Sequence, residues 1–160
     1  MQMADDTPIA FRADGSPIYD NAPTVVVGVL TDNFQAIFPK VLLIRRKCGR
    51  IALPGGFHMR GETWQQALSR EVMEETTFYA DPLKIEQFGE TVTDEYGHNL
   101  VFGKCSRTVC TSFGAVPDGE ILEAFTGDPR DFDKEEWAFP LHYKAACDYY
   151  HFLRSLPLNY

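Results

Sequence analysis

The sequence predicts an α/β protein, with a mixed β-sheet held between helices as an α/β/α sandwich. Short runs that are rich in β-branched and apolar residues, as in strands, occur before and after a segment with helical periodicity. A second segment with helical spacing, 141–153, comes near the end of the chain. Each face of the sheet therefore has a helix to cover it.

The expected strands follow one another along most of the chain. They are residues 17–19, 24–30, 40–46, 50–53, 84–93, 99–111 and 121–125, with 94–98 as the turn between two paired strands. The β-branched run 24–30 is the expected central strand, and 50–53 leads into a glycine-rich loop. Residues 1–22 are polar and turn-rich, so they are expected to form an N-terminal arm before a single domain, 23–160.

The first helix is expected to begin near Thr63 and to end at about Thr76. Thr63 followed by Gln66 has the pattern of a capping box, in which each residue satisfies a backbone N–H of the other. At about 100° per residue, the apolar side chains of this segment form one stripe. These side chains are Trp64, Ala67, Leu68 and Val72.

Three glutamates continue or border this apolar stripe. Glu71 and Glu75 fall within roughly 20° of Trp64 on the helical wheel, and Glu74 lies at the edge. Like charges at these spacings repel, and unpaired buried charge is costly, so the cluster needs a partner. Arg70 can neutralise one of the three at most. Clustered carboxylates suit Mg²⁺ or Mn²⁺, so the sequence predicts a divalent metal site.

Basic residues precede this acidic helix. Arg45, Arg46 and Arg60 lie in the segment 45–60, which contains no acidic residue. They are candidates for binding a phosphate-containing substrate, and the alternative is a charged strand end that keeps the protein soluble.

Composition limits the classes of function. A chain of 160 residues with 44% hydrophobic and 24% charged residues is ordinary for one globular domain. The net charge of −8 argues against general binding to nucleic acid or membrane surfaces. The longest apolar run, 25–30, is too short to span a bilayer. The four cysteines lack metal-binding spacing, and the start does not have the pattern of a signal peptide, so a cytoplasmic location is expected.

The segment from Gly56 to Phe78 resembles the Nudix box. That signature is Gly, five residues, Glu, seven residues, Arg-Glu, an aliphatic residue, any residue, Glu-Glu, any residue, Gly and an aliphatic residue. The charged positions all match at the right spacing: Glu62, Arg70, Glu71, Glu74 and Glu75. Thr77 and Phe78 differ from the signature. Because a left-handed residue often follows a helix, Thr77 predicts strain of roughly 1–2 kcal/mol or a different helix end.

The resemblance implies a Nudix-like fold and a Nudix-type pyrophosphohydrolase. Such an enzyme cuts a pyrophosphate bond in a nucleoside diphosphate linked to another group, by attack of water on phosphorus. The implied cofactor is Mg²⁺ or Mn²⁺, because metal ions neutralise the diphosphate and lower the pKa of bound water. Glu71, Glu74 and Glu75 would be catalytic and hold the metal with the Gly55 carbonyl, whereas Glu62 and Arg70 would brace the box.

A further catalytic acid and metal ligand is expected from a later strand or loop. Glu120, just before the apolar pair 121–122, is the candidate, and Glu123 is the alternative. A charge run with Asp131, Asp133, Glu135 and Glu136 is a weaker source.

The identity of the substrate is left open. ADP-ribose, NADH and related nucleotides all fit, and the cues conflict. Tyr96 resembles a tyrosine of members that cleave dinucleoside polyphosphates, and the segment 137–142 resembles the NADH-cleaving group. The proline of ADP-ribose-cleaving members is absent, with Val92 near its place. A non-catalytic Nudix-like sensor of nucleotides is one alternative, and an enzyme that removes damaged nucleoside triphosphates is another. The expected partner is a small-molecule nucleotide, with no nucleic acid or membrane, and formation of a homodimer is left open.

Overall fold

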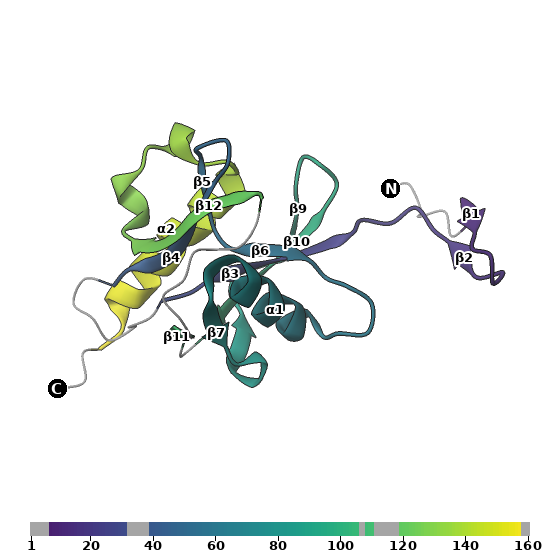
Figure 1. Ribbon diagram of the computed structural model, residues 1–160, viewed down its shortest axis with the longest axis horizontal. Helices are drawn as coiled ribbons and strands as arrows, with labels where there is room; N and C mark the ends of the chain where they lie inside the picture. The colour runs from purple at the N-terminus through teal and green to yellow at the C-terminus, as the bar shows by residue number, and fades with distance from the viewer. Residues whose placement is uncertain (1–6, 32–38, 106–107, 111–118, 158–160) are drawn as a thin grey trace.

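Two β-sheets lie between the helices α1 (Trp64–Thr76) and α2 (Pro140–Ser155) in a computed structural model of the chain (Figure 1). The structure describes residues 7–31, 39–105, 108–110 and 119–157. Among the described helices, none has both the length and the apolar character needed to cross a membrane.

The larger sheet is mixed. Its strands have the order β6 (Gly55–Phe57), β3 (Thr24–Val29), β10 (Asn99–Cys105) and β8 (Ile85–Gln87), and the short β9 (Val92–Thr93) also pairs with β10. The β3–β10 pair is parallel, and the others are antiparallel. A second sheet has the order β12 (Ile121–Gly127), β4 (Val41–Arg46) and β5 (Ile51–Ala52). Two shorter strands, β7 (Phe78–Ala80) and β11 (Thr108–Cys110), pair with each other.

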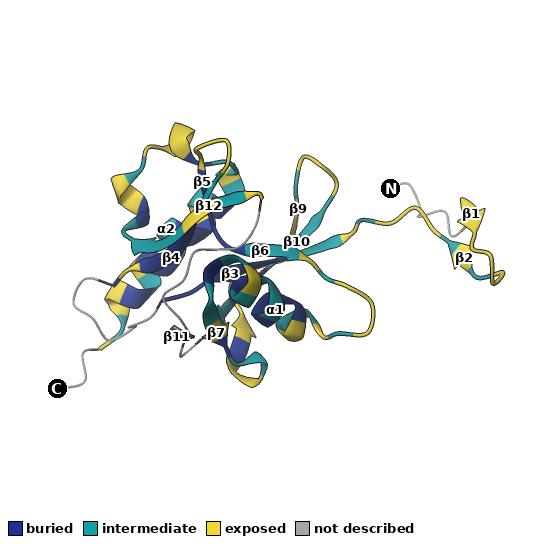
Figure 2. Cartoon of the chain, viewed as in Figure 1, coloured by how far each residue is buried: buried dark blue, intermediate teal, exposed yellow. Residues whose placement is uncertain are grey.

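Two hydrophobic cores lie between the sheets and the two helices. Figure 2 colours the buried residues dark blue. Successive side chains of a strand point to opposite faces, so β3 contributes to both cores. Val27 and Val29 belong to the core on the α2 side, whereas Val26 and Leu30 belong to the core on the α1 side. These layers confirm the predicted α/β fold with a mixed sheet between helices.

Several predicted strands are shorter than expected or interrupted. The predicted strand 84–93 is split into β8 and β9, and it begins after a 3-10 turn, Pro82–Lys84, in which the Asp81 side chain accepts a hydrogen bond from the Leu83 N–H. The predicted strand 99–111 ends at Cys105, and Thr108–Cys110 pairs elsewhere as β11; residues 106, 107 and 111 lie outside the described residues. The expected glycine loop is instead the strand β6.

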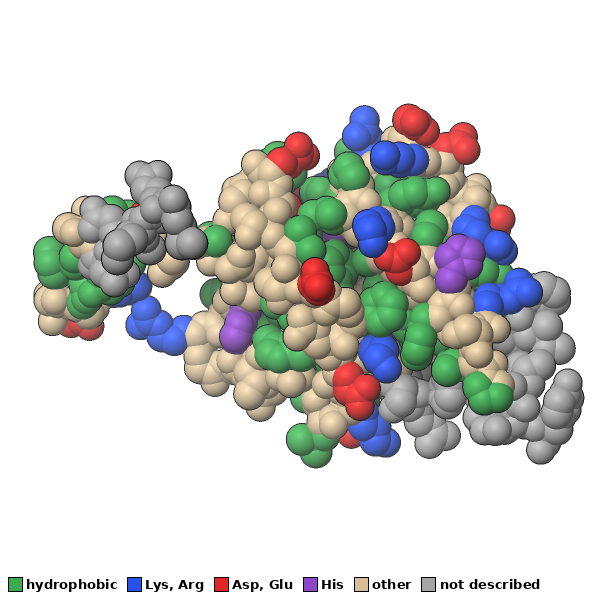
Figure 3. Space-filling model, turned by 180° about the vertical axis from the view of Figure 1, so that it is seen from behind, with side chains coloured by type: hydrophobic (Ala, Val, Ile, Leu, Met, Phe, Trp, Pro, Cys, Tyr) green, Lys and Arg blue, Asp and Glu red, His purple; other side chains and the backbone are tan. Residues whose placement is uncertain are grey.

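The N-terminal arm stands apart from the rest of the molecule (Figures 1 and 3). Its described part is a small hairpin of β1 (Ala10–Phe11) and β2 (Pro17–Ile18), of which only the second was predicted. The turn is closed by a hydrogen bond from the Arg12 N–H to the Ser16 carbonyl. The division of the chain into an arm, 1–22, and a domain, 23–160, stays a prediction.

The helix α1 begins as predicted. The Gln66 N–H donates to Thr63 Oγ1 at 3.1 Å, and the Thr63 N–H donates to the Gln66 side-chain oxygen at 2.8 Å, so the capping box is complete. The helix ends at Thr77, which is left-handed with φ of 63° and donates its N–H to the Met73 carbonyl. Among the described residues it is the one residue other than glycine with positive φ. The strained ending is therefore the one of the two predicted alternatives that occurs.

Replacing Thr77 by glycine is expected to stabilise the protein by about 1 kcal/mol, because glycine adopts the left-handed conformation without a Cβ clash. Urea unfolding of the wild type and Thr77→Gly measures the change. Thr77→Ala is the matched control, since it removes the hydroxyl and methyl groups but keeps the Cβ. A gain as large in Thr77→Ala would assign the effect to the side chain instead of the backbone.

Candidate active site

A cleft of about 720 Å³ opens between the two sheets, the last turns of α1 and the start of α2. Strands β3, β4 and β6, the turn at residues 94–98, and the first residues of α2 contribute to its walls. One part of its lining, called the acidic end below, carries Glu71, Glu74, Glu75 and Glu120. The rest of the lining, called the apolar end, is mostly apolar and aromatic. A ligand that joins charged groups to a flat apolar ring would match both ends.

The acidic end is built by close packing of α1 against the glycine strand β6. A Cβ on Gly55 would overlap the Val26 carbonyl, and a Cβ on Gly56 would overlap the Glu71 carboxylate. Gly55 therefore requires glycine, whereas a side chain at Gly56 would displace the Glu71 carboxylate. The missing side chains let Glu71 lie directly on the backbone of β6, so this carboxylate is held without a polar side chain beneath it.

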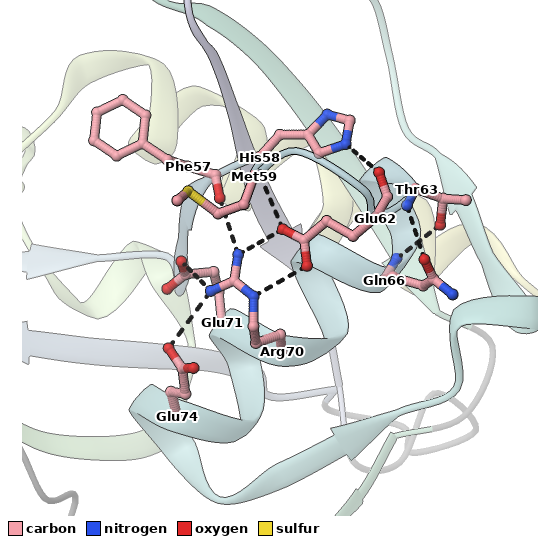
Figure 4. Close-up of polar contacts among 9 residues, drawn as sticks. All are labelled: Phe57, His58, Met59, Glu62, Thr63, Gln66, Arg70, Glu71 and Glu74. Carbon is pink, nitrogen blue, oxygen red and sulfur yellow. Dashed lines mark hydrogen bonds and ion pairs between the residues drawn. The ribbon is translucent and has the colours of Figure 1, made fainter. Parts of the chain in front are cut away.

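Arg70 ties the helix to the loop that precedes it (Figure 4). Its guanidinium donates two hydrogen bonds to the Glu62 carboxylate, at 2.7 and 3.1 Å, and a third to the Phe57 carbonyl at 3.1 Å. The two bonds to Glu62, with one from the Met59 N–H, lower the pKa of Glu62 to about 2. The pKa of Arg70 is raised in return, mainly by the same contact. The ion pair is the contact that the expected brace requires, and the bracing role itself stays a prediction.

The remaining guanidinium nitrogen of Arg70 reaches the metal-binding candidates. It donates to Glu71 at 2.8 Å and lies 3.6 Å from Glu74 (Figure 4). Glu71 is largely covered, with 17% of its side chain exposed, whereas Glu74 faces solvent at the mouth of the cleft. Arg70 therefore compensates the charge of Glu71. Glu75 has no hydrogen bond from a basic side chain among the described residues.

Glu75 is a partly buried acid of the group. Its carboxylate accepts a long hydrogen bond, 3.4 Å, from the Gly55 N–H. Burial raises the pKa of Glu75 to about 8, and the charge of Glu71 adds to the rise, while the Gly55 N–H and the charge of Arg46 oppose it. A carboxylate in this position holds a proton near neutral pH unless a cation takes the proton's place.

The donor set fits a hard divalent cation. Glu71, Glu74 and Glu75 line the same cleft as Gly55, and they supply the oxygen atoms that Mg²⁺ and Mn²⁺ prefer. Within the described residues, no three acidic, histidine or cysteine side chains converge into a ready-made metal site. Since Mg²⁺ is often held by one or two carboxylates together with water and substrate phosphate, a partial set of protein ligands is compatible with this metal.

The predicted basic residues separate. Arg46 lines the cleft, and its guanidinium lies over the Phe139 ring, 5.0 Å from the centroid. Arg45, the next residue on β4, points to the other face and donates to Glu123 at 2.9 Å, since side chains alternate along a strand. Arg60 is an exposed residue of the loop before α1 and does not line the cleft. Arg46 is thus the one of the three candidates that the structure brings to the acidic end.

The two candidates for a further acid also separate. Glu120 lies at the cleft, 3.7 Å from Arg46, with 80% of its side chain exposed. Glu123 pairs with Arg45 on the opposite face of β12 and is absent from the cleft lining. Asp131, Asp133, Glu135 and Glu136 are exposed and likewise do not line it.

Sequence reasoning gave His142 no role, although it named the segment 137–142 that carries it. This segment docks on β5, where the Ala138 N–H donates to the Ile51 carbonyl at 2.8 Å, and it delivers Phe139 and His142 to the cleft. His142 is only 7% exposed. Burial and, to a smaller extent, the charge of Arg46 lower the pKa of His142 to about 3, so the ring is neutral.

A NUDIX domain family model matches residues 22–148. The chain belongs to the NUDIX domain family. The match confirms the family that the box indicated, and it supports the expected enzyme class, a Nudix-type hydrolase. None of the curated protein sequences compared with the chain matches it significantly.

Solved Nudix structures share the fold. A NUDIX hydrolase from Nitrosomonas europaea has a TM-score of 0.64 and 21% identity, over 86% of this chain and 74% of that one. The NUDIX domain of Shewanella oneidensis NrtR, complexed with ADP ribose, has a TM-score of 0.62 and 22% identity, over 84% and 90%. An ADP-ribose pyrophosphatase from Streptococcus suis has a TM-score of 0.56 and 16% identity, over 81% and 92%.

The stability of the metal-free Nudix domain is expected to fall as pH rises from 4.5 to 8, because of Glu75. The folded state holds the Glu75 proton more tightly than the unfolded chain, whose ordinary value is 4.5. The stabilisation is therefore complete below 4.5 and is lost as pH passes the folded pKa. Glu75→Gln stays neutral, so it should match the wild type near pH 4.5 and exceed it by a few kcal/mol at pH 8.5.

Urea unfolding with a chelator present, at several pH values, measures this difference. Glu74→Gln is the control, because it removes a neighbouring carboxylate that is exposed. A wild-type and a Glu75→Gln profile that run parallel from pH 4.5 to 8.5 would contradict the expected raised pKa.

Proposed function

We propose that this Nudix domain hydrolyses a pyrophosphate bond in a nucleoside diphosphate linked to another group, such as ADP-ribose or NADH, with Mg²⁺ or Mn²⁺ as cofactor. The observation that carries the proposal is the position of Glu75. It is a partly buried acid without a basic hydrogen-bond partner among the described residues, near the carboxylate of Glu71 and in the same cleft as Arg46. The small-molecule nucleotide is the proposed partner and the cytoplasm the proposed location, and a homodimer stays a prediction.

The metal would be held by Glu71, Glu74 and Glu75, with the Gly55 carbonyl and Glu120 as further oxygen donors. A bound divalent cation would neutralise charge on the diphosphate and lower the pKa of a coordinated water. The protein sets the acids for this task beforehand. Glu71 is fixed by Arg70 and by the backbone of β6, and Glu75 by burial and the Gly55 N–H.

Arg46 is positioned to bind the diphosphate. Its side chain is kept in place by stacking on Phe139, and its ion pair with Glu120 is long and solvent-exposed, so it is weak. A planar guanidinium matches the oxygens of a phosphate group. When Arg46 engages substrate, Glu120 is released as a free carboxylate beside the reacting group, where it can accept the proton of the attacking water.

The apolar end would hold the nucleoside. Phe57, Leu100 and Phe139 line this part of the cleft, with Tyr96 at its rim. The turn that carries Tyr96 is organised by Asp94, whose carboxylate accepts hydrogen bonds from the Tyr96 and His98 N–H groups at 2.9 and 2.8 Å. A base stacked on these side chains would place its diphosphate towards Arg46 and Glu75.

A substrate panel tests the proposal. The wild type is incubated with ADP-ribose, NADH, dinucleoside polyphosphates and oxidised nucleoside triphosphates, with Mg²⁺ or with chelator, and the products are separated. Metal-dependent release of a nucleoside monophosphate from a diphosphate-linked substrate is the expected result. Release of pyrophosphate from a triphosphate would favour the sanitising enzyme. Nucleotide binding without product would favour the sensor, which the incomplete metal site among the described residues also allows.

Glu74→Gln and Glu75→Gln are each expected to lower turnover by about 100-fold or more, because each removes a charged ligand from the metal that acts in the chemical step. Steady-state kinetics on the best substrate of the panel measures the loss, and circular dichroism checks the fold. Either variant with nearly normal turnover in Mg²⁺ would exclude that glutamate from the metal site.

Glu120→Gln is expected to lower kcat by at least about tenfold and to change KM less, because a proton acceptor acts mainly in the transition state. Glu123→Gln is a matched control three residues away, on the face turned from the cleft. It should leave kcat unchanged. The opposite ranking of the two variants would assign the further acid to Glu123.

A further inference from the structure

His142 presents a hydrogen-bond donor to the apolar end of the cleft. It lies in the first turn of α2, where its backbone N–H donates to the Phe139 carbonyl at 3.1 Å. Its Nδ1 atom faces the Leu53 N–H at 3.2 Å. Because a backbone N–H can only donate, Nδ1 is the acceptor. In a neutral ring the proton then resides on Nε2.

The Nε2–H group is open to the cleft. Within the described residues, the one side-chain nitrogen or oxygen that is sealed from solvent without a hydrogen bond is Trp137 Nε1, so Nε2 of His142 is not sealed. The hydrogen bond to Leu53 is the one that the ring makes with described residues. His142 lines the cleft, and a donor there without a partner favours a ligand that brings an acceptor.

Aromatic rings fix the orientation of the imidazole. The Phe139 ring lies 4.7 Å from it, and the Phe102 ring contacts it edge-on at 6.3 Å. Turning the ring to exchange its two nitrogens would give up the hydrogen bond from the Leu53 N–H. The donor direction is therefore set before a ligand arrives, which gives the contact directional selectivity.

Arg46 connects this donor to the acidic end. Its guanidinium stacks on Phe139, the residue beside His142, and its positive charge acts on the pKa of both His142 and Glu75. Arg46 thus lies within reach of both ends of the cleft. A phosphate bound between Arg46 and Glu75 would direct the attached nucleoside towards the rings of Phe139 and His142.

We propose that His142 Nε2–H donates a hydrogen bond to a ring nitrogen or carbonyl oxygen of the nucleobase, and that His142 is a specificity-determining residue for the base. This inference rests on the proposed function only in assuming that the cleft binds a nucleotide. A fixed donor selects among bases by disfavouring those that present another donor to it. A base that turns an amino group towards Nε2 would place two donors against each other and would leave both unpaired in a largely apolar site.

Calorimetric binding tests the proposal without turnover. The four common nucleoside monophosphates are compared with ribose 5-phosphate, which has the same phosphate and sugar but no base. The wild type is expected to bind at least one monophosphate about tenfold or more tightly than ribose 5-phosphate, and to show a preference among the bases. Equal affinity for all five ligands would overturn the proposal.

Two substitutions separate the roles of the two ring nitrogens. His142→Asn keeps an oxygen that can accept from the Leu53 N–H but is too short to replace Nε2–H. His142→Gln places an amide N–H close to the position of Nε2. In His142→Asn, affinity for the preferred monophosphate should fall about tenfold while affinity for ribose 5-phosphate stays unchanged. His142→Gln should recover part of the loss.

A purely structural role for His142 would weaken both kinds of ligand equally, and that result would overturn the proposal. If His142→Asn fails to fold, the wild type is titrated with deaza or deoxo analogues of the preferred base, each lacking one acceptor atom. One analogue should bind about tenfold more weakly, and uniform affinity would again overturn the proposal. Because these assays require no hydrolysis, base selectivity in a protein that releases no product would reject the proposed enzyme and retain His142.

Discussion

The close approach of α1 to the glycine strand β6 is the constraint on which the site depends. Two successive glycines leave no side chain between the helix and the sheet, and the Glu71 carboxylate occupies the space that a Cβ on Gly56 would fill. Two sets of contacts hold the helix at this distance. Arg70 fastens it to Glu62 and to the Phe57 carbonyl, and Leu68 and Val72 pack it onto β3 from below.

This packing creates an electrostatic problem that the apo protein solves incompletely. Partly burying two carboxylates side by side is unfavourable, and Arg70 is already shared among Glu62, Glu71 and Glu74. The charge of Arg46 offsets only part of the rise in the pKa of Glu75. The raised pKa of Glu75 reflects the unfavourable burial and repulsion that these arginines do not offset. Stability is sacrificed at the place where a divalent cation would restore it, which is the usual relation between strain and function in an active site.

The opposite end of the cleft follows a different physical rule. There the polar groups are few and their hydrogen bonds are assigned: Asp94 is occupied by the N–H groups of its own turn, and Nδ1 of His142 by Leu53. In the proposed function, directional contacts in an apolar setting would distinguish one flat ring from another, whereas the acidic end would recognise charge. Arg46 acts on both ends, so it would join the binding of a phosphate to the binding of a base.

Local sequence determined the helix and the charged pattern of the box. The start of α1 at Thr63, its capping box and the left-handed Thr77 depend on residues within one or two turns, and so do the shared faces of Glu71 and Glu75. Alternation also fixed that Arg45 and Arg46 must part, although the sequence could not say which of them faces the cleft. The pairing of β4 with β12 decided that, because it joins Arg45 to Glu123 and leaves Arg46 beside Glu120.

Tertiary structure alone decided which distant residues meet. The glycine segment became strand β6 only because β3 offered an unpaired edge, and the strand predicted at 99–111 stopped at Cys105 because Thr108–Cys110 found a different partner in β7. His142 acquired its fixed tautomer from the Leu53 N–H, 89 residues away in sequence. Hydrogen bonds between segments so far apart leave no periodic or spacing signal in the chain, so sequence reasoning could name the segment 137–142 but not the histidine that it brings to the cleft.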